Sequence, residues 1–222
     1  MAVATTRKPY RGLPMEGPIA RWYAKNTARD TRGYRKTARA LAERLAPGSA
    51  VLEVAPGPGY LAIELARLGS YQITGLDISH SFVRIASENA RRAGVAIDFR
   101  HGDAAHMPFP AESFDLVFCR AAFKNFADPV GALDELHRVL RPGGQASIFD
   151  LRKDASLDAI EREVRGMRLS PLNAFLTMWT FRLMLLRSAY SREALTAMVA
   201  RSRFGRGEIV EDGIELELRL AK

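Results

Sequence analysis

Two glycines and three acids in the first half of the chain could together hold a small, positively charged ligand that carries a ribose. Gly57 and Gly59 in "VAPGPG" leave the backbone free of side chains, so a ligand can touch it. Asp77 ends "ITGLD", where a carboxylate can accept hydrogen bonds from two ribose hydroxyls. Glu53 precedes the glycines, and Asp103 in "HGDAAHMPF" can face the exocyclic amine of an adenine. Three carboxylates repel a pyrophosphate but attract ammonium and sulfonium groups.

Each of these features also has a simpler interpretation. Any one of the acids alone could cap a turn or sit at a solvated strand end. The spacing Gly57-x-Gly59-x-x-Ala62 also fits the fingerprint of dinucleotide-binding proteins, so an NAD-dependent oxidoreductase stays open as an alternative. The Tyr-x-x-x-Lys pair of one large reductase family is missing from the chain.

Strands and helices that alternate along the chain would position these residues. Apolar runs predict strands, and periods near 3.6 predict helices between them. Such alternation indicates a parallel sheet with helices on both faces, and ligands bind at the carboxyl ends of its strands. Asp212-Gly213 predicts a closing hairpin. The predicted strands are 50–55, 72–77, 96–101, 114–119 and 145–151, and the predicted helices are 18–28, 31–45, 59–68, 80–93 and 129–140, with Ser79 or Ser81, Asp128 and Ser191 as N-caps.

The fold class we expect is α/β, doubly wound and Rossmann-like. Its mostly parallel sheet would have seven strands, with the C-terminal antiparallel hairpin and a helical lid insert. The 222 residues, of which 47% are hydrophobic, suit one main domain. We expect a basic arm and lid helices over 1–45 and the main domain over 46–222, with a helical cap at 155–190. The single cysteine, Cys119, favours a buried strand residue and excludes a disulfide framework.

Positive charge is concentrated at the N-terminus. Residues 1–44 contain eleven Lys and Arg against three Asp and Glu, and the remainder holds 22 of each sign. Such a segment attracts nucleic acid, anionic lipid or an acidic substrate, although a solvated arm and helix face is the simpler interpretation. Residues 1–17 lack the apolar run of a secretory signal, and no stretch is long enough to span a membrane, so we expect a cytoplasmic protein.

Several stretches resemble the class I S-adenosylmethionine-dependent methyltransferases, particularly the type 11 branch that acts on small molecules and quinones. They are "VLEVAPGPG", "ITGLDIS", "GDAAHMPFPAESFDLVFCRAAFKNFADP" and "ELHRVLRPGGQASIFD". The resemblance covers residues 20–151 and implies S-adenosylmethionine as the methyl donor. Together with the acids above, it gives these candidate donor-binding residues: Tyr23, Glu53, Ala55, Pro56, Gly57, Gly59, Asp77, Ile78, Gly102, Asp103, Ala104, Arg120 and Ala121.

The chain departs from the family pattern where that pattern often carries two histidines. Lys124 and Asn125 stand there instead, so the family does not supply a catalytic base. His106 and Lys124 remain as candidates for the base. The simpler interpretation is that His106 is an exposed loop histidine and that Lys124 is a solvated helix residue. Alignment of the acceptor with the methyl group and exclusion of water can catalyse the transfer without a base. No His or acid spacing predicts a metal site.

The stretch "NAFLTMWTFRLMLL" at 173–186 is too apolar for a solvated helix. We expect a lid over a small, apolar or aromatic acceptor, with Phe175, Met178, Trp179 and Arg182 facing it. Two alternatives stay open for this stretch. It could form a helix that packs on the core or on the second subunit of a homodimer, or a helix that lies on a lipid surface. A phospholipid or nucleic-acid methyltransferase that uses the basic N-terminus stays open, although nucleic acid is disfavoured because the Asn/Asp-Pro-Pro-aromatic motif is missing.

Overall fold

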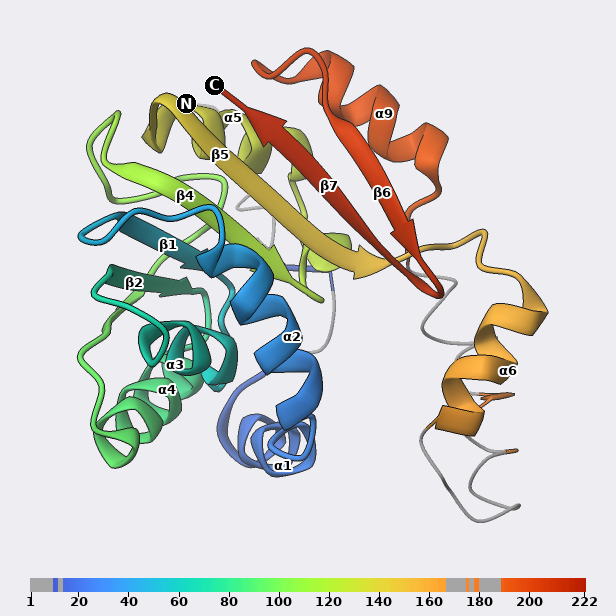
Figure 1. The fold of residues 1–222 in the computed structure, drawn as a ribbon, viewed down its shortest axis with the longest axis horizontal. Helices are drawn as coiled ribbons and strands as arrows, with labels where there is room; N and C mark the ends of the chain where they lie inside the picture. The colour runs from blue at the N-terminus through green and yellow to red at the C-terminus, as the bar shows by residue number, and fades with distance from the viewer. Residues whose placement is uncertain (1–9, 12–13, 167–174, 176–177, 180–188) are drawn as a thin grey trace, which may run out of the picture.

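A seven-stranded sheet forms the centre of the molecule (Figure 1). The computed structural model describes residues 10–11, 14–166, 175, 178–179 and 189–222. The strand order is β3-β2-β1-β4-β5-β7-β6, and only the β5–β7 and β6–β7 pairs are antiparallel. This confirms the predicted fold class. The strands are β1 (Ala50–Val54), β2 (Gln72–Asp77), β3 (Asp98–His101), β4 (Phe114–Arg120), β5 (Leu140–Leu151), β6 (Glu208–Asp212) and β7 (Glu215–Ala221).

Helices cover both faces of the sheet (Figure 1). On one face, α2 (Thr31–Ala42), α3 (Tyr60–Ala66) and α4 (His80–Ala93) enclose an apolar cluster that includes Leu41 and Phe118. On the other face, α5 (Pro129–Val139) and α9 (Arg192–Arg201) enclose a second cluster around Leu133 and Val117. The strands of the central sheet are therefore buried on both sides, as their continuous apolar runs predict.

Side-chain caps begin three of the helices where the sequence predicts them. The Oγ of Ser79 accepts a hydrogen bond from the amide of Phe82 at 3.0 Å, and the carboxylate of Asp128 caps α5. Ser191 caps α9. The strand predicted at 145–151 begins earlier than expected, because the segment 141–144 is also part of β5. The register against β4 shifts there, which accommodates the two glycines within the strand.

The N-terminal part of the chain crosses the carboxyl ends of the strands. We call residues 10–11 and 14–28 the crossing segment; it contains α1 (Gly17–Thr27). The amide of Arg11 donates to the carbonyl of Asn125, which follows β4, at 2.8 Å. The carbonyl of Met15 accepts from Ser79, which follows β2, at 2.6 Å. The beginning of the chain that is described is therefore packed on the site edge of the sheet and is not a solvated arm.

The predicted cap begins with α6 (Leu157–Gly166). Ile160 and Val164 are buried and pack with Ile214 and Met178. Arg182 lies outside the described residues, as do most of 167–188. No helix within the described ranges is both long and apolar enough to cross a bilayer.

Candidate functional site

The loop after β1 combines a tightly packed glycine with an open one. Ala55, Gly57 and Gly59 all have positive φ angles, of 55°, 53° and 77°. A Cβ on Gly59 would lie 2.8 Å from the Phe99 ring, so this glycine is required for packing. A Cβ on Gly57 would have no heavy atom of the described residues within 4 Å. The backbone at Gly57 therefore faces open space in which a ligand can approach it.

Asp77 fastens this loop to the end of β2. Its carboxylate accepts hydrogen bonds from the amide of Gly57 at 2.9 Å and from the amide of Ser79 at 2.8 Å. Burial raises the pKa of Asp77 to about 6, and the two amide hydrogen bonds oppose this shift. The side chain is thus a buried acid that joins two loops at neighbouring strand ends. Unshared lone pairs on both oxygens leave capacity for further donors.

Glu53 lies beneath the same loop. Its carboxylate is buried and accepts a hydrogen bond from the amide of Ala62, in the first turn of α3, at 3.0 Å. Burial raises the pKa of Glu53 to about 8, and the nearby Asp77 carboxylate raises it further, whereas Arg120 lowers it. Two acids therefore lie close together in low-dielectric surroundings, and a cation bound beside them would stabilise their ionised forms.

The loop after β3 lies beside Asp77. The amide of Gly102 donates to the backbone carbonyl of Asp77 at 3.0 Å. Asp103 accepts from the amide of Ala105 at 3.0 Å and lies 3.3 Å from His106. The His106 side chain is 82% exposed. Asp103 thus lies in the loop after β3, the strand that neighbours β2, whereas His106 faces solvent. Of the remaining residues predicted here, Ile78 and Ala104 belong to the same loops and Pro56 is buried.

At the end of β4, Arg120 bridges two parts of the fold. Its guanidinium lies 3.5 Å from Asp30, at the start of α2, and 3.5 Å from Glu215 of β7. It also lies 5.2 Å from the centre of the Tyr34 ring. Burial raises the pKa of Tyr34 to about 12. The guanidinium lowers the pKa values of Tyr23 and Glu53 against the effect of burial, so Arg120 lies near both of these side chains.

Lys124 is held in a buried ion pair. Its Nζ lies 2.6 Å from Asp150 and donates to the carbonyl of Ala121 at 2.9 Å. The Asp150 carboxylate also accepts from the amide of Lys124 at 3.0 Å. Ala121 has a φ of 60°, a conformation that costs about 1–3 kcal/mol without glycine and clusters at functional sites. The pair therefore stabilises a strained turn, and the ammonium is engaged as a donor.

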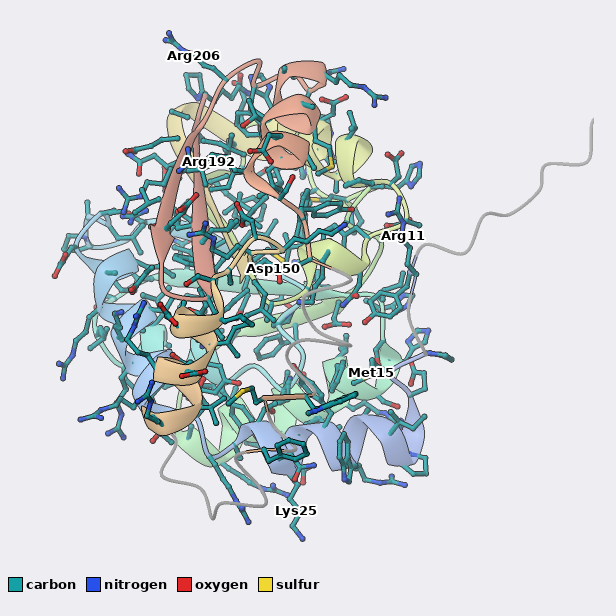
Figure 2. All side chains as sticks on the ribbon, turned by 90° about the vertical axis from the view of Figure 1, so that its right-hand side faces the viewer. Arg11, Met15, Lys25, Asp150, Arg192 and Arg206 are labelled. Atoms are coloured by element: carbon teal, nitrogen blue, oxygen red, sulfur yellow. The ribbon has the colours of Figure 1, made fainter. Side chains whose placement is uncertain are left out.

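Tyrosines of the crossing segment face these acids. Burial raises the pKa of Tyr23, and both Asp77 and Asp150 lie near enough to raise it further. The same two carboxylates raise the pKa of Tyr10. Two phenols and two carboxylates therefore surround one region between the crossing segment and the strand ends. Figure 2 shows this side of the molecule, with Asp150, Arg11 and Met15 labelled.

Sequence reasoning did not select Tyr10 or Asp150. The sequence could have indicated Asp150, because it is an acid at the carboxyl end of a predicted strand, as Asp77 is. Nothing in the sequence indicates Tyr10, because its position depends on a bridge to the distant residue Phe126. Of the predicted lid, Met178 packs against the α6 cluster, and Phe175 and Trp179 are exposed. No cluster of three or more metal-ligating side chains occurs among the described residues.

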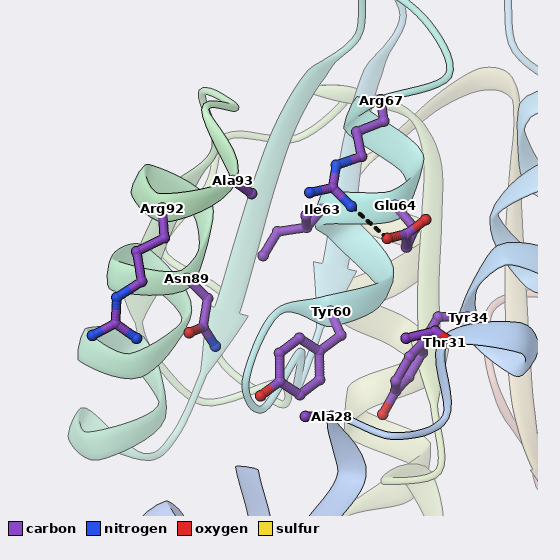
Figure 3. A pocket seen from close by; sticks show the side chains of 10 residues that line it. All are labelled: Ala28, Thr31, Tyr34, Tyr60, Ile63, Glu64, Arg67, Asn89, Arg92 and Ala93. Atoms are coloured by element: carbon purple, nitrogen blue, oxygen red, sulfur yellow. Dashed lines mark hydrogen bonds and ion pairs between the residues drawn. The ribbon is translucent and has the colours of Figure 1, made fainter. Parts of the chain in front are cut away.

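A separate cavity of about 290 Å³ lies on the outer side of α3 (Figure 3). Tyr34 and Tyr60 form one wall, with ring centres 5.7 Å apart, and Asn89 of α4 lies opposite. Arg67 at its rim is paired with Glu64 at 2.6 Å. None of the predicted site residues lines this cavity, and it lies beside the helices and not at the strand ends. The candidate site considered below is therefore the one at the strand ends.

Residues 52–148 match the family model described as "Methyltransferase domain". A demethylmenaquinone methyltransferase of Deinococcus radiodurans is 40% identical over 126 residues, which are 56% of this chain and 52% of that protein. A 2-phytyl-1,4-naphtoquinone methyltransferase of Synechococcus elongatus is 37% identical over 114 residues, 50% of this chain and 49% of that protein. The chain thus spans about half the length of the known relatives it matches.

The fold is also similar to that of a solved S-adenosylmethionine-dependent methyltransferase from Aquifex aeolicus. The TM-score is 0.70 at 18% sequence identity, over 90% of this chain and 97% of the other. The family-model match covers residues 52–148, which lie within the stretch 20–151 in which the sequence resembles class I methyltransferases. It confirms that resemblance and the donor that the resemblance implies.

Proposed function

Because residues 52–148 belong to the methyltransferase domain family, we propose that this protein transfers a methyl group from S-adenosylmethionine to a small, apolar, quinone-like acceptor. The observation that carries the proposal is the hydrogen bond between Asp77 and the amide of Gly57. It holds an acid suited to ribose hydroxyls against a loop that is open above Gly57. The assignment of individual donor-binding residues is part of this proposal.

The residues present fit such a donor. Asp77 has lone pairs available for ribose hydroxyls, and Glu53 adds a second negative charge beneath the loop when it is ionised. Both suit the ammonium and sulfonium groups of S-adenosylmethionine. Ile78 would lie along the adenine, and Asp103 with Ala104 would meet its edge. Tyr23, which lies near both Asp77 and Arg120, would cover the donor from the crossing segment.

When bound, S-adenosylmethionine would supply an already activated methyl group, and S-adenosylhomocysteine would be the leaving group. The protein's own contribution is to orient the acceptor and exclude water. The crossing segment closes the strand ends, and the Lys124–Asp150 pair fixes the turn at Ala121. Neither Lys124, which donates to two oxygens, nor the exposed His106 is poised to accept a proton. We therefore assign catalysis to alignment and desolvation.

An apolar acceptor is supported by the cap and by the relatives. The described part of the cap packs Met178 on the α6 cluster and carries the exposed rings of Phe175 and Trp179. The names of two relatives state that they methylate a demethylmenaquinone and a phytyl naphthoquinone. A lid over an acceptor of that kind is the role we propose for Phe175, Met178, Trp179 and Arg182.

Calorimetric titration with S-adenosylmethionine, S-adenosylhomocysteine and NAD tests the donor. We expect both sulfur compounds to bind more tightly than NAD, and tighter binding of NAD would overturn the proposal. Transfer of labelled methyl to quinols, phenols, amines, phospholipids and RNA then tests the acceptor, with a quinol expected to be the best substrate. Asp98→Ala, at an exposed acid on β3, is the control for variants of Asp77.

A separate experiment tests His106 as a general base. If alignment suffices, His106→Ala changes kcat by less than about twofold, whereas loss of a general base costs about a hundredfold or more. A pH profile of kcat distinguishes alignment alone from general-base catalysis. With a histidine base, kcat of the wild type would fall at low pH as the base is protonated, and the His106→Ala variant would lack this fall.

A further inference from the structure

The outer face of α1 exposes a large aromatic side chain. Trp22 is 67% exposed and Ile19 is 44% exposed, and they are one helical turn apart. The opposite face of the helix is fixed to the body, with Ala20 and Ala24 buried. The exposure is therefore a property of a well-anchored helix. Several large apolar side chains that are exposed next to one another, especially with polar side chains around them, indicate a surface used for interaction.

Basic side chains accompany these apolar ones. Arg21 and Lys25 are exposed on α1, and Arg29 is exposed just beyond its end. Trp22, Lys25 and Arg29 follow one another at spacings of three and four residues, so they lie along one line of the helix surface. The stretch 17–29 contains no Asp or Glu. Figure 2 shows α1 along the lower edge of the molecule, with Lys25 directed away from the body.

We infer that the outer face of α1 docks on the surface of an anionic lipid bilayer. Tryptophan prefers the interface between headgroups and acyl chains, and Lys and Arg are attracted to anionic headgroups. The face offers both, with the tryptophan among the cations. A nucleic acid would also match the charge, but Ile19 and Pro18 offer it no stacking surface, whereas both suit the acyl boundary.

Docking through this face gives the crossing segment a second role. Tyr23 on the inner side of α1 lies near Asp77, while Trp22 beside it faces outward. The helix that covers the strand ends would thus be the one that rests on the bilayer, which shortens the path of a membrane-dissolved acceptor to the site. Docking itself is independent of methyl transfer; its use in delivering an acceptor rests on the proposed function.

Flotation of the full chain with lipid vesicles tests the inference without donor or acceptor. We expect binding to phosphatidylcholine vesicles that contain about one-third phosphatidylglycerol, weak binding to phosphatidylcholine alone, and release as salt rises. Trp22→Ala should weaken binding about tenfold, and Lys25→Glu should weaken it more than fivefold. The matched controls are Leu68→Ala, at a side chain 44% exposed at the far end of α3, and Arg91→Glu on α4.

A fluorescence measurement reports where the tryptophan goes. The chain has two tryptophans, so Trp179→Phe leaves Trp22 as the single reporter. Its emission should shift to shorter wavelength on anionic vesicles and be quenched by brominated acyl chains. Unchanged emission, equal binding of Trp22→Ala and the wild type, or equal binding to both vesicle types would overturn the inference. So would tighter binding to single-stranded RNA. Because Trp22→Ala retains the inner face of α1, unchanged donor binding shows that it folds.

Discussion

Replacing Glu53 by Gln is expected to reduce the pH dependence of stability. Burial raises the pKa of Glu53 from its ordinary value of 4.5 to about 8. Between these two values the folded protein holds a proton that the unfolded chain has released. The free energy of unfolding therefore falls as the pH rises through this window, because the unfolded chain binds fewer protons. Glutamine does not titrate, so the variant lacks this contribution.

The size of this pH dependence follows from the single proton that Glu53 binds in the folded protein. Each pH unit inside the window changes the free energy of unfolding by up to about 1.4 kcal/mol. Between pH values of about 6 and about 7.5, the wild type should therefore lose about 2 kcal/mol more than Glu53→Gln. About half of the titration of Asp77, whose pKa burial raises to about 6, falls above pH 6, but both proteins retain Asp77, so the comparison between them removes its contribution. The Gln oxygen can still accept from the amide of Ala62.

Urea unfolding followed by circular dichroism at the two pH values measures the effect. Taking the difference between the two pH values cancels any fixed cost of burying the new amide. Glu88→Gln, at an exposed glutamate of α4, is the control and should retain the wild-type difference. A wild type whose stability does not fall over this range, or a Glu53→Gln variant that falls equally, would refute the reasoning from burial.

Three further substitutions test other parts of the site. Asp77→Ala should weaken the binding of S-adenosylmethionine more than tenfold while the fold is retained, and an unchanged affinity in calorimetry would exclude the ribose role. Gly59→Ala should cost about 2–4 kcal/mol in urea unfolding, because it adds a steric clash to a positive φ, whereas Gly94→Ala, which has a φ of 70° and no heavy atom of the described residues within 4 Å of its Cβ, should cost only about 1 kcal/mol. Lys124→Met should destabilise the protein by about 3–5 kcal/mol, since it leaves Asp150 buried without a cation, and a neutral result would mean that the pair does not support the turn.

The sheet and its helices could be predicted from the sequence because local signals agree with the fold. Apolar runs such as 114–119 become buried central strands, and Ser79 and Asp128 cap the helices that follow them. The turn at Asp212-Gly213 likewise needs only its own residues, with Gly213 at a φ of 60°. In these places a few neighbouring residues are enough to determine the local structure.

The rest of the site depends on contacts between distant parts of the chain. Arg11 meets Asn125, and Met15 meets Ser79, through backbone groups that carry no sequence signal. Lys124 reads as a solvated helix residue until β5 places Asp150 beside it. Such partners emerge only once the sheet has assembled, which is why the acids of the loops and the helix at 18–28 were predicted, whereas the attachments of the crossing segment to the strand ends were not.

The crossing segment also constrains the sequence of events during turnover. It is attached beside β4 through Arg11 and beside β2 through Met15, so it closes the site from both sides. With the donor at the proposed site, exchange of a spent cofactor for a fresh one would require at least one of these attachments to open. Since the same segment carries Trp22, the docking inferred for the outer face of α1 would couple the lifetime of the protein on a lipid surface to the rate of cofactor exchange.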